Sequence, residues 1–198
     1  MSNQRNKNRL LIVSIFAMSI VPFLIAWGLK QNPQFLSGRT YHGLLISAAV
    51  TTERSELLGF DQFSQDNIKE LAGHWLIVNV IPSKGCNELC MQSIQKTKQL
   101  RLMLNKELTR TRRVVLVVQD VSPEIASKWW ESDDTLLKIK PSAAVVKKIT
   151  ELRSGIIPDG MIFLMDPLGN LMMQYEPGFD PYDVKNDLMH LLRISQIG

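Results

Sequence analysis

Long apolar runs and amphipathic stretches alternate along this chain, and they predict its elements. The first apolar run, from Leu10 to Leu29, contains twenty residues without a charge. A helix rises about 1.5 Å per residue, so such a run spans about 30 Å, the thickness of the hydrocarbon core of a bilayer. Pro22 is tolerated in a membrane helix, and Trp27 lies where interfacial aromatic residues anchor such helices. The run predicts a transmembrane anchor at 10–29.

Basic residues before the anchor indicate its orientation. Arg5, Lys7 and Arg9 directly precede the apolar run. Because basic flanks stay in the cytoplasm, we expect a cytoplasmic amino terminus at 1–9 and export of everything after the anchor. The alternative is a cleaved signal peptide, whose apolar core is typically about 7–15 residues and so shorter than this run. A weak cleavage site at 26–28 keeps that alternative open, although the length favours a retained anchor.

A polar linker at 30–42 separates the anchor from a single predicted domain at 43–198. The apolar sequence at 43–50 predicts an early strand beside the core. The run WLIVNVI at 75–81 is continuously apolar, which is typical of a strand buried on both faces. A second run of this kind, VVLVVQD, lies at 114–120 after a basic turn at 110–113.

The remaining segments predict helices and a closing hairpin. Helices are expected at 87–107, after Pro123, at 141–154 and after Pro181, and a hairpin is expected from the strands 161–166 and 171–175. Strands that alternate with helices predict parallel strands joined by crossovers, with the hairpin as an antiparallel edge. The sequence thus favours an α/β fold with a central mixed sheet.

The net charge of +4 does not indicate nucleic-acid binding. It comes from Arg5, Lys7, Arg9 and Lys30, because the rest of the chain holds 19 basic and 19 acidic residues. A formally neutral domain lacks the basic surface that phosphate binding requires. We therefore expect no nucleic-acid partner.

The chain has two cysteines, Cys86 and Cys90, at the passage from the strand 75–81 into the following helix. On a helix, residues four apart share one face, at a Cα separation of about 6 Å that a disulfide accepts. A helix amino terminus also favours a thiolate. Such a pair can cycle between dithiol and disulfide or hold Cu(I). The alternative is a permanent structural disulfide, although a loop this short contributes little stability.

The sequence GHWLIVNVIPSKGCNELC, followed by a helix and VVLVVQDVSP, resembles the Sco (SenC) family. Later, MIFLMDPLGN matches a family strand that ends in Asp-Pro-x-Gly. The resemblance covers roughly 71–198 and implies a thioredoxin-like fold behind a single transmembrane helix. It also implies assistance to the copper site of cytochrome c oxidase, with an oxidase subunit or another copper chaperone as partner. The implied location is the bacterial inner membrane with the domain in the periplasm, or the equivalent side of an organelle membrane.

Two departures from the family pattern change this picture. By counting back from Asp166, the copper-binding histidine of the family falls at Pro158, and no histidine lies between Cys90 and His190. Thioredoxin-like oxidoreductases carry a cis-proline in this loop, so we expect Pro158 to fill that role beside the dithiol. The family's Cys-Pro is also absent, because Asn87 follows the first cysteine.

Three functions remain open from the sequence. In the leading hypothesis the protein exchanges disulfides during oxidase assembly, with Cys86 attacking, Cys90 resolving the mixed disulfide and Pro158 shaping the partner's groove. In the second it is a Cu(I) metallochaperone that uses both cysteines with a methionine such as Met91 or a ligand from the partner. In the third it is a non-catalytic assembly or scaffold protein. His42 is expected to be structural or solvated, and the pair Trp129-Trp130 to form either a partner surface or part of the core.

Overall fold

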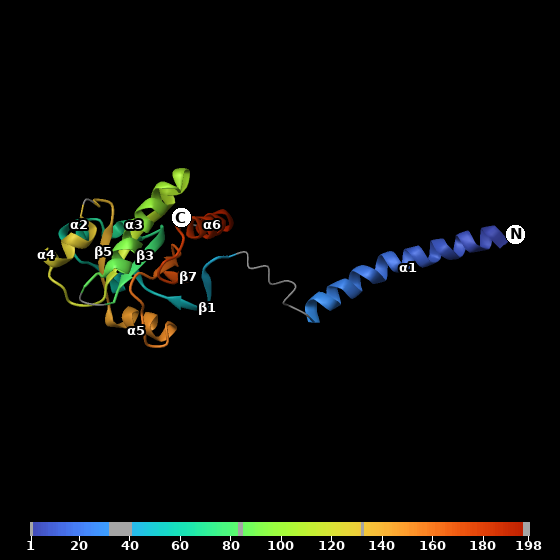
Figure 1. Cartoon of the computed structure of the whole chain (residues 1–198), viewed down its shortest axis with the longest axis horizontal. Helices are drawn as coiled ribbons and strands as arrows, with labels where there is room; N and C mark the ends of the chain where they lie inside the picture. Colours follow the sequence, from blue (N-terminus) through green and yellow to red (C-terminus); the bar gives the residue numbers. More distant parts are fainter. Residues whose placement is uncertain (1, 32–40, 83–84, 132, 196–198) are drawn as a thin grey trace. The chain divides into compact units, whose positions relative to one another are not determined.

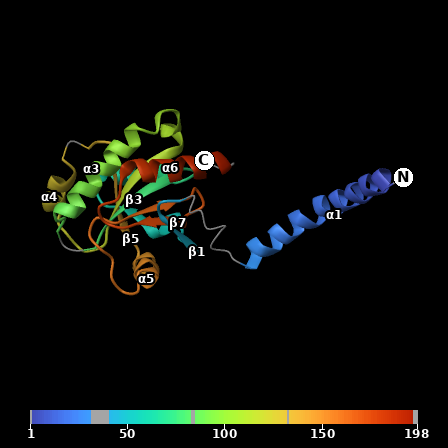
Figure 2. The same ribbon diagram turned by 45° about the vertical axis from the view of Figure 1, so that its right-hand side comes forward.

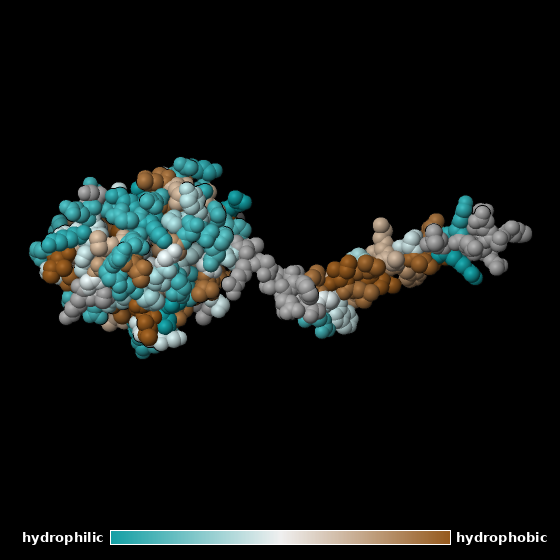
Figure 3. Space-filling view, viewed as in Figure 1, coloured by the Kyte–Doolittle hydropathy of each residue, from teal (hydrophilic) through white to brown (hydrophobic). Residues whose placement is uncertain are grey.

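A computed structural model of the chain describes residues 2–31, 41–82, 85–131 and 133–195 (Figure 1). Contacts within the chain separate it into two units, residues 1–40 and residues 41–198. The first unit contains helix α1 (Ser2–Gln31), with Pro22 inside it. Its stretch Leu11–Gln31 is long and apolar enough to cross a membrane, a property that anchors and signal sequences share. Figure 3 shows the apolar residues of α1 in brown, with hydrophilic residues toward its ends.

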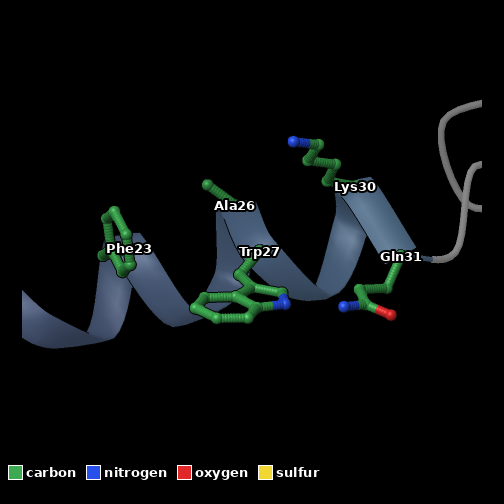
Figure 4. Close-up of a pocket in the computed structure, with 5 residues that line it drawn as sticks. All are labelled: Phe23, Ala26, Trp27, Lys30 and Gln31. Carbon is green, nitrogen blue, oxygen red and sulfur yellow. The ribbon is translucent and has the colours of Figure 1, made fainter.

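The end of α1 brings aromatic and polar side chains together. Figure 4 shows Phe23 and Trp27 beside the polar side chains of Lys30 and Gln31. The two aromatic rings meet edge to face with their centroids 6.3 Å apart. Tryptophan beside a basic residue is typical of the boundary between hydrocarbon and headgroups. The interfacial position of Trp27 stays a prediction.

The second unit is built on one sheet of seven strands in the order β1-β7-β6-β3-β4-β5-β2. Neighbours β3, β4 and β5 are parallel, and every other pairing in the sheet is antiparallel. Strand β3 is buried along its whole length at the centre, as its apolar sequence predicts. The strands are β1 (Leu44–Thr51), β2 (Leu57–Gly59), β3 (Trp75–Ile81), β4 (Thr111–Val117), β5 (Leu137–Pro141), β6 (Ile162–Met165) and β7 (Asn170–Tyr175).

Helices cover both faces of the sheet (Figure 2). Successive side chains of a strand point to opposite faces. Ile77 therefore packs with α3 and α6 on one face, and Val78 packs with α5 on the other. The helices of this unit are α2 (Gln62–Asp66), α3 (Glu88–Leu102), α4 (Pro123–Ala126), α5 (Ala143–Leu152) and α6 (Pro181–Ile194), with single 3-10 turns η2 (Arg54–Glu56), η3 (Ile68–Leu71), η4 (Asn105–Arg110) and η5 (Ser127–Trp130).

The prediction of a basic turn at 110–113 is wrong for most of its length. Strand β4 begins at Thr111, and Arg113 lies inside it with a fully buried side chain. A buried arginine is tolerated only where charge and hydrogen bonds compensate its lost hydration. Asp133, from the loop before β5, supplies that charge. The strand therefore starts three residues earlier than its apolar run.

The edges of the sheet also differ from the prediction. The hairpin β6–β7 lies inside the sheet because β1 pairs with β7 and forms the edge. The other edge is β2, which pairs with β5; neither strand is in the predicted set. Each is short, with three and five residues, so neither carries a period long enough to read from sequence.

The predicted linker at 30–42 lies mostly at 32–40, outside the described residues. Its last residue, His42, belongs to the folded unit. The backbone N–H groups of His42 and Gly43 both donate to Asp187 Oδ2 on α6, each at 2.9 Å. The folded contacts thus begin before the predicted boundary at 43.

Candidate redox site

Cys86 and Cys90 form a disulfide between the carboxyl end of β3 and the first turn of α3. Their Cα atoms are 5.2 Å apart. Cys86 is half-buried, whereas Cys90 is only 2% exposed. Of the two cysteines, Cys86 is therefore the one with exposed surface. That Cys86 attacks and Cys90 resolves stays a prediction.

Cys90 lies in the first turn of α3, and Cys86 lies just before the helix, near the amino terminus where the sequence predicts it. Asn87 is the N-cap of α3, with an extended backbone, and Cys86 precedes it. The side-chain oxygen of Asn87 accepts a hydrogen bond from the backbone N–H of Cys90 at 3.0 Å. Asparagine is a strong N-cap because its oxygen satisfies one of the unpaired N–H groups at a helix start. The extended cap residue brings Cys86 back against Cys90.

The loop before β6 lies beside the disulfide. Asp159 Oδ2 accepts a hydrogen bond from the side-chain amide of Asn87 at 2.9 Å. Gly160 is buried, with a φ of +86°, and a Cβ atom built on it would lie 2.7 Å from the carbonyl oxygen of Leu89. The two contacts join this loop to the residues between the cysteines.

Pro158 is half-buried in that loop, but the expectation of a cis-proline is wrong. The described peptide bonds are all trans, including the bond between Ile157 and Pro158. The chain reverses here through a turn in which Met161 N–H donates to Pro158 C=O at 3.5 Å and Gly160 adopts its positive φ. Glycine at such a position makes the turn without a cis bond. That Pro158 shapes a groove for the partner stays a prediction.

Aromatic side chains support the disulfide from inside. Trp129 and Trp130 are buried on η5 and pack in one cluster with Cys90, and Cys86 packs against the same cluster. Their rings meet edge to face at 5.7 Å, and Phe60 packs on Trp130 in the same manner. Of the two alternatives for the tryptophans, packing in the core is the one observed.

A buried polar network lies under α3, and sequence reasoning missed it. Arg113 Nη1 donates to Asp133 Oδ2 at 2.6 Å, and its Nη2 donates to the Ile94 carbonyl at 2.9 Å. Thr97 on α3 donates to Asn79 on β3, which in turn donates to Ser93 on α3, both at 2.8 Å. Burial lowers the pKa of Arg113, while its hydrogen bond with Asp133 opposes that shift. The network fixes the helix that carries Cys90. Asn79 inside an apolar run was the one signal of it in the sequence.

The cysteine pair does not fit a three-ligand copper site. Among the residues that the structure describes, no group of three His, Cys, Asp or Glu side chains could hold a metal ion. The histidines make other contacts: His42 with Asp187, His74 with the carbonyl of Ala72, and His190 with Tyr41. Met91 follows Cys90 and is 44% exposed.

A disulfide at the junction of a central strand and a helix, in a mixed sheet flanked by helices, defines a thioredoxin-like protein. This chain belongs to the family of transmembrane-like, thioredoxin-like, C-terminal domains, whose family model matches residues 75–195. The predicted thioredoxin-like fold is thereby confirmed. Comparison with curated proteins finds no match.

Solved structures with a similar fold include Sco proteins. The apo Sco1 protein from Thermus thermophilus has a TM-score of 0.54 at 15% identity, over 78% of this chain and 99% of that chain. Yeast Sco1 with copper bound has a TM-score of 0.51 at 16% identity, over 64% of this chain and 83% of that chain. At such identities the likeness concerns the fold. It agrees with the architecture that the sequence resemblance implies.

Proposed function

We propose that this protein is a membrane-anchored, Sco-like factor that exchanges disulfides with a partner during assembly of cytochrome c oxidase. One observation carries the proposal: the disulfide joins a half-buried Cys86 to a buried Cys90 at a helix start. An accessible thiol beside a protected one can form a mixed disulfide and then release it. The α1 anchor and the basic residues before it support a domain on the outer side of the membrane.

The exchange uses each thiol in a separate step. The Cys86 thiolate attacks one sulfur of a partner disulfide, so that a mixed disulfide forms and the other partner sulfur leaves as a thiolate that takes up a proton. The Cys90 thiol then loses its proton to solvent and attacks the Cys86 sulfur. This step forms the Cys86–Cys90 bond and releases the second partner thiol. Two electrons pass to the partner, and each step is reversible.

The link to oxidase assembly rests on resemblance and fold. The sequence around Cys86, Cys90 and Asp166 resembles the Sco family, and the fold is that of Sco1 proteins. Among the described residues, the two cysteines have no third His, Cys, Asp or Glu ligand beside them. Copper handling would need a ligand from the partner, such as an oxidase subunit or another copper chaperone.

The test is exchange by the full-length chain in detergent. We expect the reduced wild type to reduce a small-molecule disulfide and to return to the Cys86–Cys90 disulfide. Cys90→Ser is expected to stop at a mixed disulfide on Cys86, because the resolving thiol is missing. Cys86→Ser is expected to react slowly, because burial shields the remaining thiol. Mass spectrometry of acid-quenched samples identifies each species.

Two outcomes would contradict the proposal. A wild-type protein that fails to exchange would indicate a structural disulfide, and normal oxidase levels in cells carrying both Cys→Ser changes would indicate a scaffold. An anaerobic Cu(I) titration of wild type and Cys86→Ser distinguishes a Cu(I) metallochaperone from a protein that only exchanges disulfides. Tight binding that depends on Cys86 without any exchange would favour a metallochaperone.

A further inference from the structure

Three large apolar side chains are exposed at the end of the folded unit opposite the disulfide. Leu102 ends α3, Ile194 ends α6 and Leu168 lies in the β6–β7 turn, with exposed fractions of 67%, 63% and 63%. The turn lies at the amino end of β3 because β6 runs antiparallel to β3. Helix α3 returns the chain to the amino end of β4, and α6 lies beside α3 (Figure 2).

A hollow lies at this end, between the β6–β7 turn and the end of α6. Leu168 and Ile194 line it, and Trp75, Met172 and Leu191 are also part of its lining. Exposed apolar surface of this kind marks a site of contact with another protein or with a membrane. The charges around the hollow and the course of the chain distinguish these two partners.

The charged residues at this end leave an excess of positive charge. Lys106, just after α3, and Arg193, beside Ile194, are both exposed, and neither forms an ion pair within the part of the chain that the structure describes. The neighbouring carboxylates are occupied: Glu107 pairs with Arg110, and the Asp166 side chain accepts from backbone N–H groups of its own turn. The apolar hollow is therefore bordered by cations, which fits a partner with negative charge above an apolar layer.

The chain that arrives from α1 joins the folded unit on α6. The Tyr41 ring meets the His190 ring edge to face at 6.0 Å, one helical turn before Ile194. Nine residues, 32–40, connect Tyr41 to Gln31 at the end of α1. An extended chain advances at most about 3.6 Å per residue, so the two Cα atoms lie within about 36 Å of each other. An anchor in the bilayer would thus hold α6 close to the lipid surface.

We propose that the end of the folded unit formed by Leu102, Lys106, Leu168, Arg193 and Ile194, here called the Leu168 surface, docks on the anionic lipids of the membrane that holds α1. The inference rests on the anchor in the proposed function, and it is independent of the exchange chemistry. Apolar side chains enter the boundary between headgroups and acyl chains, while lysine and arginine attract anionic headgroups. The short tether gives the surface a high effective concentration at the bilayer, so weak docking suffices.

Docking at this end orients the disulfide. Trp75 begins β3, and Cys86 follows the carboxyl end of the same strand. Seven residues of strand at about 3.3 Å each separate the two ends by roughly 20 Å. The docked unit therefore turns Cys86 away from the bilayer. Its exchange partner would present a disulfide in a water-exposed domain that stands about this far above the headgroups.

The experiment places a fluorescent side chain at each end of the full-length protein in vesicles. Leu168→Trp keeps the surface apolar, whereas Ile125→Trp marks α4, which follows the carboxyl end of β4 and has Ile125 56% exposed. The vesicles contain brominated phosphatidylcholine, with or without phosphatidylglycerol, and the quenching of the wild-type tryptophans is subtracted. With phosphatidylglycerol, we expect the emission added by Leu168→Trp to fall about twofold and that added by Ile125→Trp to stay unchanged.

Charge reversal tests the attraction to anionic lipid. Lys106→Glu combined with Arg193→Glu, in the Leu168→Trp protein, is expected to abolish the quenching, and about 0.5 M salt is expected to weaken it through screening. Both substitutions are at exposed positions far from the cysteines. Exchange of this variant with a small-molecule disulfide is therefore expected to match that of the wild type.

Equal quenching of Leu168→Trp and Ile125→Trp would overturn the inference, and equal quenching without phosphatidylglycerol would overturn the choice of an anionic surface. An emission change that follows the protein density in the vesicles, at constant lipid composition, would overturn it in favour of a second copy of the chain. A wild type that stays in the vesicles after an alkaline wash but does not exchange disulfides would end the proposed exchange and leave the docking standing. Release by that wash would remove the anchor, and with it the docking.

Discussion

At the scale of single residues, the buried Arg113 shows how much of the site depends on one charge. Its side chain is fully buried, and its guanidinium contacts Asp133, Thr97 and the Ile94 carbonyl. Removing one partner of a buried ion pair leaves the other charge without compensation. Because Ile94 and Thr97 lie on α3, this charge also supports the helix that begins at the disulfide.

We predict that Asp133→Ala destabilises the folded protein by about 3–5 kcal/mol, because it leaves the Arg113 guanidinium buried and unpaired. Denaturant unfolding of the oxidised protein measures the change. Combining Asp133→Leu with Arg113→Met is expected to recover most of the loss, since the apolar pair needs no compensation.

The exposed pair of Lys140 and Asp120 provides the control. Their side chains are 52% and 87% exposed. Solvent screens such pairs, so Asp120→Ala is expected to cost less than about 1 kcal/mol. Equal losses for Asp133→Ala and Asp120→Ala would show that the buried network does not support the fold.

At the scale of elements, the turn before β6 is what brings the Asp159 loop to α3. Its Gly160 adopts a positive φ and lies against the backbone of Leu89, so an added side chain does not fit there. Gly155, in the same connection between α5 and β6, has a φ of +98° but no atom within 4 Å of a built Cβ. Alanine at Gly155 would therefore introduce backbone strain alone, whereas alanine at Gly160 would introduce both strain and a steric clash.

We predict that Gly160→Ala destabilises the protein by about 2–4 kcal/mol, through backbone strain together with a clash against the Leu89 carbonyl. Gly155→Ala is expected to cost about 1–2 kcal/mol from strain alone. Thermal unfolding of both variants beside the wild type measures the difference. A similar loss for the two would mean that the loop is not held against α3.

At the scale of the folded unit, its first residues are fixed to its last helix. Asp187 on α6 is buried and accepts hydrogen bonds from the backbone of His42 and Gly43 and from the Tyr175 hydroxyl. The His42 ring contacts Asp187 and Asp183. The hydrogen bond with Asp187 is the largest influence on the pKa of His42 and raises it. Burial acts in the opposite direction, and the charges of Asp183, Asp187 and Asp180 add to the rise, so that the pKa is raised overall.

We predict that this contact stabilises the fold more at acidic than at alkaline pH. Because the pKa of His42 is raised on folding, its contribution is complete below the unfolded value of about 6.5 and is lost as the pH rises through the folded pKa. The Tm difference between wild type and His42→Gln is therefore expected to be largest in mildly acidic buffer and to vanish at alkaline pH. A difference that grows with pH would contradict the assignment.

The sequence by itself determined the features that need only local information. A charge-free run predicts the helix α1, which continues past the run at both ends. An unbroken apolar run gives β3, and the positions of Asp180 and Pro181 give the start of α6. The position of the cysteines between β3 and α3 was also predictable, because strand and helix have different periods.

Tertiary structure alone decided the extent of β4, the edges of the sheet and the contacts around the disulfide, because these features depend on residues distant in sequence. Strand β4 includes Arg113 because Asp133, twenty residues further along the chain, forms an ion pair with it. The β6–β7 hairpin is internal because β1 pairs with β7 and covers that edge. The same holds for the site. Asn87 could be recognised as a possible cap, but its contact with Asp159, 72 residues away, exists only once the sheet brings that loop to the start of α3.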